Sequence, residues 1–197
     1  ADWWVQTVGS VPTAAFTITK LAWVAEHEPD LLSRIRSICV PHDWLTYKLT
    51  GRHVTDRSDA SGTGCFSVQG EWLAGLLADV ISPDMDWPSI VPHVLGPSEP
   101  AGQVQPAIAR ELGLRADVIV GPGAGDQHAG AVGLGLAEGE VLYSLGTSGV
   151  VITTSKNPVF DFTGMVNSVA DAAGRFLPLV CTLNCTKVTD TSPVYWA

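Results

Sequence analysis

A short β-branched run that leads into a cluster of glycines constrains the fold more than any other feature of this chain. Val118, Ile119 and Val120 are followed by six glycines within residues 121–135. An apolar run of this kind favours a buried strand, and glycine permits the positive φ angles of a tight turn. We therefore expect a buried strand over 118–120, a tight turn, and a helix that begins at Gln127.

A second glycine segment, Gly146–Gly149, separates two β-rich runs at residues 141–145 and 150–154. Two such runs around a short glycine-containing loop predict a β-hairpin. Residues 176–183 are also apolar and β-branched enough to predict a strand.

The residues before 118 have a different pattern. Apolar side chains recur at helical spacing, which predicts helices over segments 18–25, 31–38, 44–49, 72–80 and 106–112. Pro29 and Gly51 are placed to end the first and third of these helices. Between the helices we expect a short strand at 38–40, a polar loop at 52–65 and an extended, proline-rich connection at 82–102.

Composition narrows the functional classes. Charged residues make up 16% of the 197 residues, against about 25% in an average soluble domain, and the net charge is −9. An acidic chain does not suit a nucleic-acid backbone, and its apolar content argues against disorder. No apolar run is long enough to span a membrane, and the four cysteines lack metal-site spacing, so we expect a cytoplasmic protein with free thiols.

The glycine turn carries the first candidate for chemistry, because Asp126 and Gln127 follow it directly. A carboxylate at such a turn can accept a proton from a substrate hydroxyl, although Asp is also a common helix N-cap. The turn matches neither the dinucleotide-binding nor the Walker A pattern.

The hairpin loop carries the second candidate. Successive backbone N–H groups at Gly146, Thr147 and Ser148 can form an anion-binding nest, with an ordinary hairpin turn as the alternative. A proton acceptor and a phosphate cradle are two of the parts that phosphoryl transfer requires. No metal site is predicted: the five histidines show no ligand spacing and are expected at the surface or satisfied, although His128 adjoins Gln127.

These segments resemble the FGGY family of carbohydrate kinases, and most closely its xylulokinases. The likeness rests on Gly-Ala-Gly-Asp-Gln at residues 123–127 and on Ser-Leu-Gly-Thr-Ser-Gly-Val at 144–150. Residues 17–27 resemble the first family signature, from which Ala15 departs, and residues 55–63 resemble a loop typical of xylulokinases. In that loop Asp59, Ser61 and Thr63 either line a sugar cleft or form a solvated loop, and both interpretations stay open.

The resemblance implies an α/β fold of two ribonuclease H-like domains, as in actin, with mixed sheets and flanking helices. Residues 1–136 would be the latter part of the N-terminal domain, and residues 137–197 the start of the C-terminal domain. The family's opening Asp-x-Gly-Thr strand and its adenosine motif are not found, so we expect an internal segment that is inactive alone.

The resemblance also implies the roles of the candidate residues. Asp126 would be the catalytic base and would bind the sugar together with Gln127, while Gly146, Thr147 and Ser148 would hold the phosphates of ATP, used with Mg²⁺. The expected reaction converts D-xylulose to D-xylulose 5-phosphate. Ribulokinase, glycerol kinase or a non-catalytic sugar-binding relative are the alternatives, and a homodimer is left open.

Overall fold

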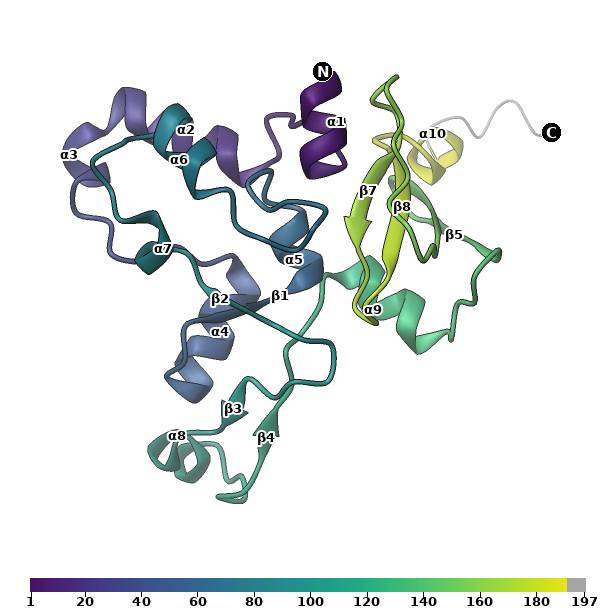
Figure 1. Ribbon diagram of the computed structural model, residues 1–197. Helices are drawn as coiled ribbons and strands as arrows, with labels where there is room; N and C mark the ends of the chain where they lie inside the picture. Colours follow the sequence, from purple (N-terminus) through teal and green to yellow (C-terminus); the bar gives the residue numbers. More distant parts are fainter. Residues whose placement is uncertain (191–197) are drawn as a thin grey trace.

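The computed structural model describes residues 1–190, and its first part is mainly helical (Figure 1). The helices are α1 (Asp2–Val8), α2 (Thr17–His27), α3 (Pro29–Leu32), α4 (Pro41–Thr50), α5 (Arg57–Ser61), α6 (Ala74–Val80), α7 (Trp87–Ile90) and α8 (Pro106–Glu111). Two small sheets accompany them: β1 (Val54–Asp56) lies parallel to β2 (His93–Leu95), and β3 (Gly102–Gln103) lies antiparallel to β4 (Ile119–Val120).

The core of this part forms where the predicted helical stripes meet. Ile18 and Leu21 of α2 are buried with Leu77 of α6 and Trp87 of α7. Proline at the first position of α4 starts that helix, and Gly51 ends it in the left-handed conformation at φ 75°. The helices predicted at 18–25, 44–49, 72–80 and 106–112 are thus confirmed, with small shifts of their ends.

Two predictions for residues 31–40 are wrong. The helix expected over 31–38 stops at Leu32, and residues 38–40 form no strand. The Ile38 N–H donates to the carbonyl of Ile90, while the Val40 N–H donates to the Asp43 carboxylate at 3.2 Å. The backbone groups of this stretch are therefore satisfied by a loop and a side chain rather than by a ladder.

The segment expected to be a polar loop, residues 52–65, instead forms β1 and α5 and is mostly buried. Asp56 caps α5 by accepting the N–H groups of Ser58 and Asp59. Ser58 and Ala60 are small enough to pack closely, with exposures of 1% and 0%. The proline-rich stretch 82–102 likewise contains α7 and β2, because proline is tolerated in the first turn of a helix.

The second part is a four-stranded antiparallel sheet, in the order β5–β6–β8–β7, with two helices. The strands are β5 (Val141–Leu145), β6 (Gly149–Thr153), β7 (Asn167–Ala170) and β8 (Phe176–Thr182), and the helices are α9 (Asp126–Gly133) and α10 (Thr186–Asp190). The predicted hairpin and the strand at 176–183 are confirmed, whereas β7 was not predicted. Ala131 of α9 packs with Ile152 and Leu177 of the sheet.

The strand expected over 118–120 is shorter and more exposed than predicted. It comprises Ile119 and Val120, pairs only with the two residues of β3 among the described strands, and leaves Ile119 64% exposed. The β-branched run was therefore correctly identified as a strand, but its burial was not.

The two parts meet where α5 lies beside β7 (Figure 1). The Ala170 N–H donates to Ser61 Oγ at 2.9 Å, and the Ser168 N–H donates to the Gly9 carbonyl at 2.8 Å. A β-carbon on Gly9, whose φ is 80°, would lie 2.4 Å from the Ser168 carbonyl oxygen. Glycine is thus required for this close approach.

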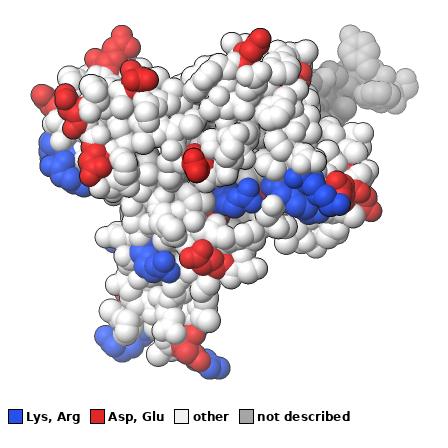
Figure 2. Space-filling model, viewed as in Figure 1, with Lys and Arg blue, Asp and Glu red and all other residues white. Residues whose placement is uncertain are grey.

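The face seen in Figure 2 is mostly uncharged, and its Lys and Arg side chains form no continuous basic surface. This agrees with the low charged content and the net charge of −9. Among residues 1–190 no helix has the length and apolarity needed to cross a bilayer.

Candidate active site

The glycine turn between β4 and α9 packs directly against side chains of the first part. Gly123 has φ 83°, and a β-carbon there would lie 2.5 Å from Nε2 of His42. A β-carbon on Gly125 would lie 2.7 Å from Nδ1 of His128 and 3.2 Å from Asp59 Oδ1. Glycine at both positions therefore lets the backbone approach the side chains of His42, Asp59 and His128 this closely.

Asp126 is the first residue of α9, one position earlier than expected, and it is exposed. Its Oδ1 accepts the N–H of Gln127 at 2.7 Å, while the N-cap position belongs to Gly125. Gln127 is half-buried beside it. An exposed carboxylate fixed at the end of a rigid turn is open to a hydroxyl group from solvent.

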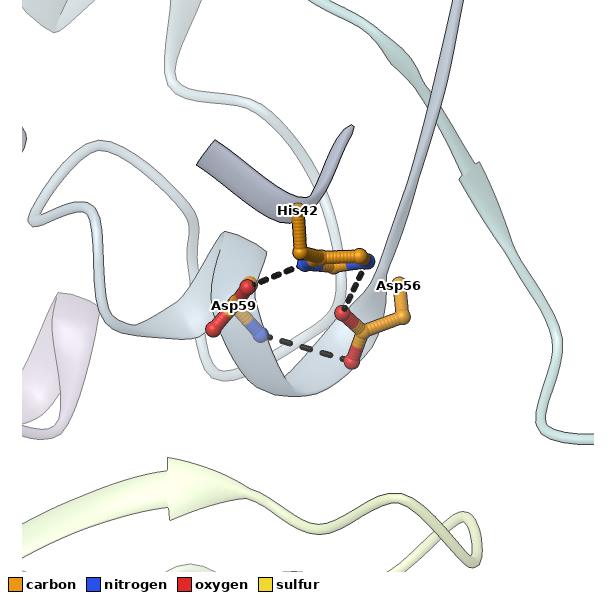
Figure 3. A group of neighbouring side chains, drawn as sticks. All are labelled: His42, Asp56 and Asp59. Carbon is orange, nitrogen blue, oxygen red and sulfur yellow. Dashed lines mark hydrogen bonds and ion pairs between the residues drawn. The ribbon is translucent and has the colours of Figure 1, made fainter. Parts of the chain in front are cut away.

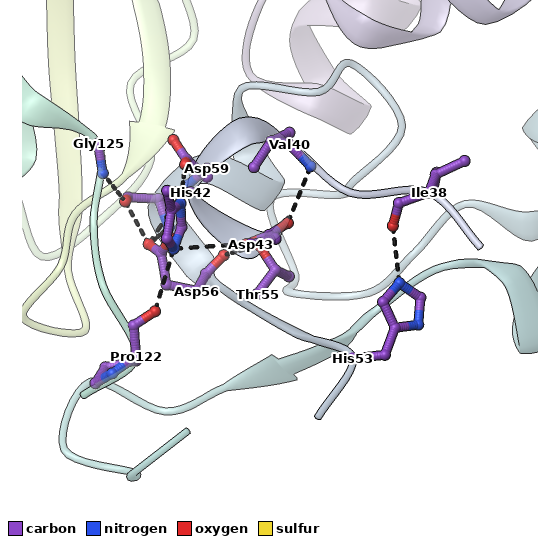
Figure 4. Close-up of polar contacts among 11 residues, drawn as sticks. Ile38, Val40, His42, Asp43, His53, Thr55, Asp56, Asp59, Pro122 and Gly125 are labelled. Carbon is purple, nitrogen blue, oxygen red and sulfur yellow. Dashed lines mark hydrogen bonds and ion pairs between the residues drawn. The ribbon is translucent and has the colours of Figure 1, made fainter. Parts of the chain in front are cut away.

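Next to the turn lies a cluster that we call the His42 cluster: His42 and Asp43 of α4, Asp56 of β1 and Asp59 of α5. Figure 3 shows His42 between Asp56 and Asp59, and Figure 4 adds Asp43. Nδ1 of His42 lies 2.5 Å from Asp59 Oδ2. Its Nε2 lies 3.5 Å from Asp43 Oδ1 and 3.6 Å from Asp56 Oδ2. One imidazole therefore faces three carboxylates.

Burial and charge set the protonation states in this cluster. The hydrogen bond with Asp59 raises the pKa of His42 to about 9, against the opposing effect of partial burial. Burial raises the pKa of Asp43 to about 6 and also raises the pKa of Asp56. At neutral pH His42 is therefore a cation that faces the carboxyl groups of Asp43, Asp56 and Asp59.

The geometry also raises the question of a metal ion, because one ligand atom each of His42, Asp56 and Asp59 lie within 4.8 Å of one another. However, the short contact between His42 and Asp59 joins two of these ligand atoms to each other. Mg²⁺ prefers an octahedron of oxygen ligands, which this set does not offer. We interpret the cluster as an imidazolium–carboxylate network.

The turn is tied to this network at two points (Figure 4). Nε2 of His42 lies 3.3 Å from the carbonyl oxygen of Pro122. The N–H of Gly125 donates to Ser58 Oγ at 3.1 Å, and Ser58 Oγ in turn donates to Asp56 Oδ1. Residues that are far apart in the sequence thus fix the backbone that precedes Asp126.

His128 lies on α9 next to the turn, with both ring nitrogens buried and without a hydrogen-bond partner in the described residues. Burial lowers its pKa, so the ring is neutral at pH 7. The sequence-based expectation of surface or satisfied histidines is wrong for His128.

The hairpin loop lies at the other end of the β5–β8 sheet, beside α10 (Figure 1). Gly146 and Thr147 are exposed and Ser148 is half-buried. The carbonyl of Gly146 accepts from the N–H and the hydroxyl of Thr186, and the carbonyl of Thr147 accepts from the N–H of Cys185. The Gly146 N–H donates to the Ser148 carbonyl within the loop.

The structure brings Asp126 and Gln127 together but does not join them to the hairpin loop. In residues 1–190, no hydrogen bond or ion pair links either residue to Gly146, Thr147 or Ser148.

Of the three residues proposed for the sugar cleft, only Asp59 is partly open. Its side chain is 27% exposed, whereas Ser61 and Thr63 are buried, with exposed fractions of 5% and 4%. The solvated-loop interpretation is therefore wrong for Ser61 and Thr63, whose side chains make hydrogen bonds inside the structure, as from Thr63 Oγ1 to the Ala60 carbonyl. That these two residues line a sugar cleft stays a prediction.

Sequence reasoning missed His42, Asp43, Asp56 and Ser58. Asp56 and Ser58 lie in the segment 55–63 that the resemblance singled out, and this signal pointed in the right direction. His42 and Asp43 carried no signal, because only tertiary contacts distinguish them: His42 contacts the glycine turn at Pro122, and Asp43 lies beside His42.

Comparisons with known proteins identify relatives of this chain. Residues 4–133 match the FGGY family of carbohydrate kinases, N-terminal domain. The chain is 44% identical to xylulose kinase of Streptomyces rubiginosus over 190 residues, which is 96% of this chain and 38% of that protein. It therefore spans well under half the length of this relative.

Solved structures give the same result. A xylulose kinase structure from Bifidobacterium adolescentis superimposes with a TM-score of 0.85 at 39% identity, over 97% of this chain and 42% of that one. One from Brucella ovis gives 0.89 at 31% identity, over 99% of this chain and 40% of that one.

Proposed function

Since this chain belongs to the FGGY family of carbohydrate kinases, we propose that the full-length protein transfers the γ-phosphoryl group of ATP to a sugar hydroxyl. The proposed substrate is D-xylulose and the product D-xylulose 5-phosphate, because relatives that are 44% and 42% identical are xylulose kinases. The observation that carries the proposal is the exposed Asp126 carboxylate at the end of a glycine turn held by two hydrogen bonds.

In the proposed reaction Asp126 acts as the catalytic base and also binds the sugar. Its carboxylate takes the proton of the attacking hydroxyl while the new bond from oxygen to the γ-phosphorus forms. The bond between the γ-phosphorus and the β–γ bridging oxygen breaks, and ADP leaves. A base positioned in this way typically accounts for about 10²–10⁴ in rate. Half-buried Gln127, next to Asp126, is proposed to contact the sugar.

Gly146, Thr147 and Ser148 are proposed to hold the phosphates of ATP. Exposure of Gly146 and Thr147 supports this role, as does the contact of their carbonyls with the start of α10, which fixes the loop from behind. Mg²⁺ would neutralise phosphate charge when it is bound with ATP. Its proposed ligands are the phosphate oxygens, since the His42 cluster lacks an oxygen set suited to it.

We further propose that residues 1–136 belong to the N-terminal domain of such a kinase and that residues 137–197 begin the C-terminal one. The family match ends at residue 133, which supports this division. α9, whose Ala131 packs against the four-stranded sheet, lies just before this proposed boundary. We also propose that the protein acts in the cytoplasm on a small sugar and ATP. Whether it forms a homodimer is a separate question that the proposal does not decide.

Asp126→Asn in the full-length protein tests the proposed base. We expect kcat for D-xylulose phosphorylation to fall by about 10²–10⁴, because the amide cannot accept the proton at that position. ADP formation in a coupled assay measures the rate. Asp117→Asn is the matched control, since Asp117 is exposed and pairs only with Arg115 in the described residues. Phosphorylation by Asp126→Asn at the rate of the control would contradict the assignment.

A substrate panel tests the choice of sugar. We expect the highest kcat/KM with D-xylulose among xylulose, ribulose and glycerol. Preference for ribulose or glycerol would reassign the protein within the family. Sugar binding by calorimetry without any ATP turnover would instead favour a non-catalytic sugar-binding protein.

A further inference from the structure

Two hydrogen bonds hold the segment before Asp126 from opposite sides. At its start the carbonyl of Pro122 faces Nε2 of His42 at 3.3 Å, and at its end the N–H of Gly125 reaches Ser58 Oγ at 3.1 Å. One contact uses a donor and the other an acceptor. The backbone between them can therefore neither slide nor rotate without breaking one of the two bonds.

His42 is itself fixed so that its Nε2 points at the turn. Asp59 accepts from Nδ1 at 2.5 Å, which leaves Nε2 on the opposite side of the ring as the second donor. The side chain of His42 is only 26% exposed, and the absence of a β-carbon on Gly123 leaves room for the ring. Gly123 thus leaves the space that the oriented ring of His42 occupies.

We propose that His42 and Ser58 are positioning residues that hold the glycine turn and thereby set the place of the Asp126 carboxylate. This inference rests on the proposed role of Asp126 as the base. It assigns a function to two residues of the first part of the chain that do not touch the reacting groups. A misplacement of about 1 Å at a reacting group can cost about 10²-fold in rate.

The alternative is that His42 only neutralises the three carboxylates around it. The two explanations differ in which ring nitrogen matters. If His42 positions the turn, the decisive donor is Nε2, which faces Pro122. If His42 only compensates charge, any neutral replacement is equally harmful.

A pair of amide substitutions separates these explanations. The side-chain nitrogen of Gln can reach the place of Nε2, whereas that of Asn reaches only the place of Nδ1. Both variants remove the positive charge, so we expect similar urea midpoints for His42→Gln and His42→Asn. We expect kcat of the full-length protein to fall by about tenfold or more in His42→Asn and less in His42→Gln.

Hydrogen exchange of the backbone gives a readout that does not depend on activity. In His42→Asn the N–H of Gly125, which donates to Ser58 Oγ, should exchange at least about tenfold faster than in wild type, while the amides of α2 remain protected. Ser58→Ala keeps His42 and its contact with Asp59, removes the hydroxyl that bonds to Asp56 and to Gly125, and should also speed exchange at Gly125. His93→Gln is the control, because His93 is exposed and its ion-pair partner is Glu99 rather than a residue of the turn.

The outcomes distinguish this inference from the proposed function. Unchanged exchange of the Gly125 N–H in both His42→Asn and Ser58→Ala would overturn the positioning role, whatever the kinase assays show. Equal losses of kcat in His42→Gln and His42→Asn would favour simple charge compensation and also overturn it. If Asp126→Asn stays active while the turn loosens as expected, the catalytic assignment fails and the mechanical role of His42 stands.

Discussion

At the scale of single residues, the protonation of His42 links the site to stability. The ordinary pKa of histidine is near 6.5, and contact with Asp59 raises that of His42 to about 9. The folded state therefore binds this proton more tightly than the unfolded chain does. Its stabilising contribution is complete below about pH 6.5 and is lost as the pH rises through 9.

We expect the free energy of unfolding to decrease between pH 6.5 and pH 9, with at most about 3 kcal/mol of the loss due to His42. Urea midpoints of wild type and His42→Gln over this range measure the effect. The slope should be flatter in the variant, which has no proton to lose at this site. Burial raises the pKa of the Cys65 thiol to about 11, so most of its titration falls above this range in both proteins. Equal slopes in both proteins would contradict the expectation.

At the scale of elements, the hairpin of β5 and β6 is held at its tip by the start of α10. Thr186 Oγ1 donates to the Gly146 carbonyl at 2.7 Å. At the far end of the same hairpin, Thr153 Oγ1 donates to the Glu140 carbonyl at 2.6 Å. These two threonines make the same kind of bond at opposite ends of one element.

Thr186→Val should raise KM for ATP by about two- to tenfold, because losing one hydrogen bond of about 0.5–1.5 kcal/mol loosens the loop proposed to hold the phosphates. Thr153→Val should leave KM for ATP near the wild-type value. Initial rates at varied ATP and saturating sugar give both constants. A similar rise in the two variants would show that the tip has no special role.

Prediction of the elements succeeded where local patterns decide the outcome. The apolar stripe of α2, the glycine end of α4 and the β-rich runs of the hairpin were all read correctly. Residues 52–65 were misread because their polar side chains are satisfied by buried hydrogen bonds, as with Ser58 and Asp56. A polar pattern does not distinguish such a segment from a solvated loop.

At the scale of the whole molecule, one buried hydrogen bond joins α5 to β7. Ser61 Oγ accepts the N–H of Ala170 at 2.9 Å, and both residues are buried. Through this bond the segment that carries Asp59 is attached to the four-stranded sheet. The site therefore depends on how the two parts of the chain are packed together.

Ser61→Ala should lower the free energy of unfolding by about 1–3 kcal/mol, because the Ala170 N–H is left buried without an acceptor. Ser89→Ala is the matched control, since Ser89 is exposed and bonds locally to Asp86, and it should stay within about 0.5 kcal/mol of wild type. Equilibrium unfolding in urea measures both. Equal stability of Ser61→Ala and the control would mean that this bond does not couple the two parts.

The low charged content of the chain is accompanied by exposed apolar side chains on β5. Val141, Tyr143 and Leu145 alternate along one side of β5 and are 51%, 64% and 65% exposed. β5 is an edge strand of its sheet, and an exposed apolar edge is prone to pair with further chain. The chain spans only 38% of the Streptomyces rubiginosus relative.

The sequence alone determined the family, the glycine turn before Asp126 and the hairpin at Gly146, because each depends on residue types at fixed local spacing. Tertiary structure alone decided that His42 and Ser58 hold that turn. Hydrogen bonds across 80 residues, such as that from His42 to Pro122, depend on how α4 and α5 pack beneath the turn. No local periodicity encodes such a contact.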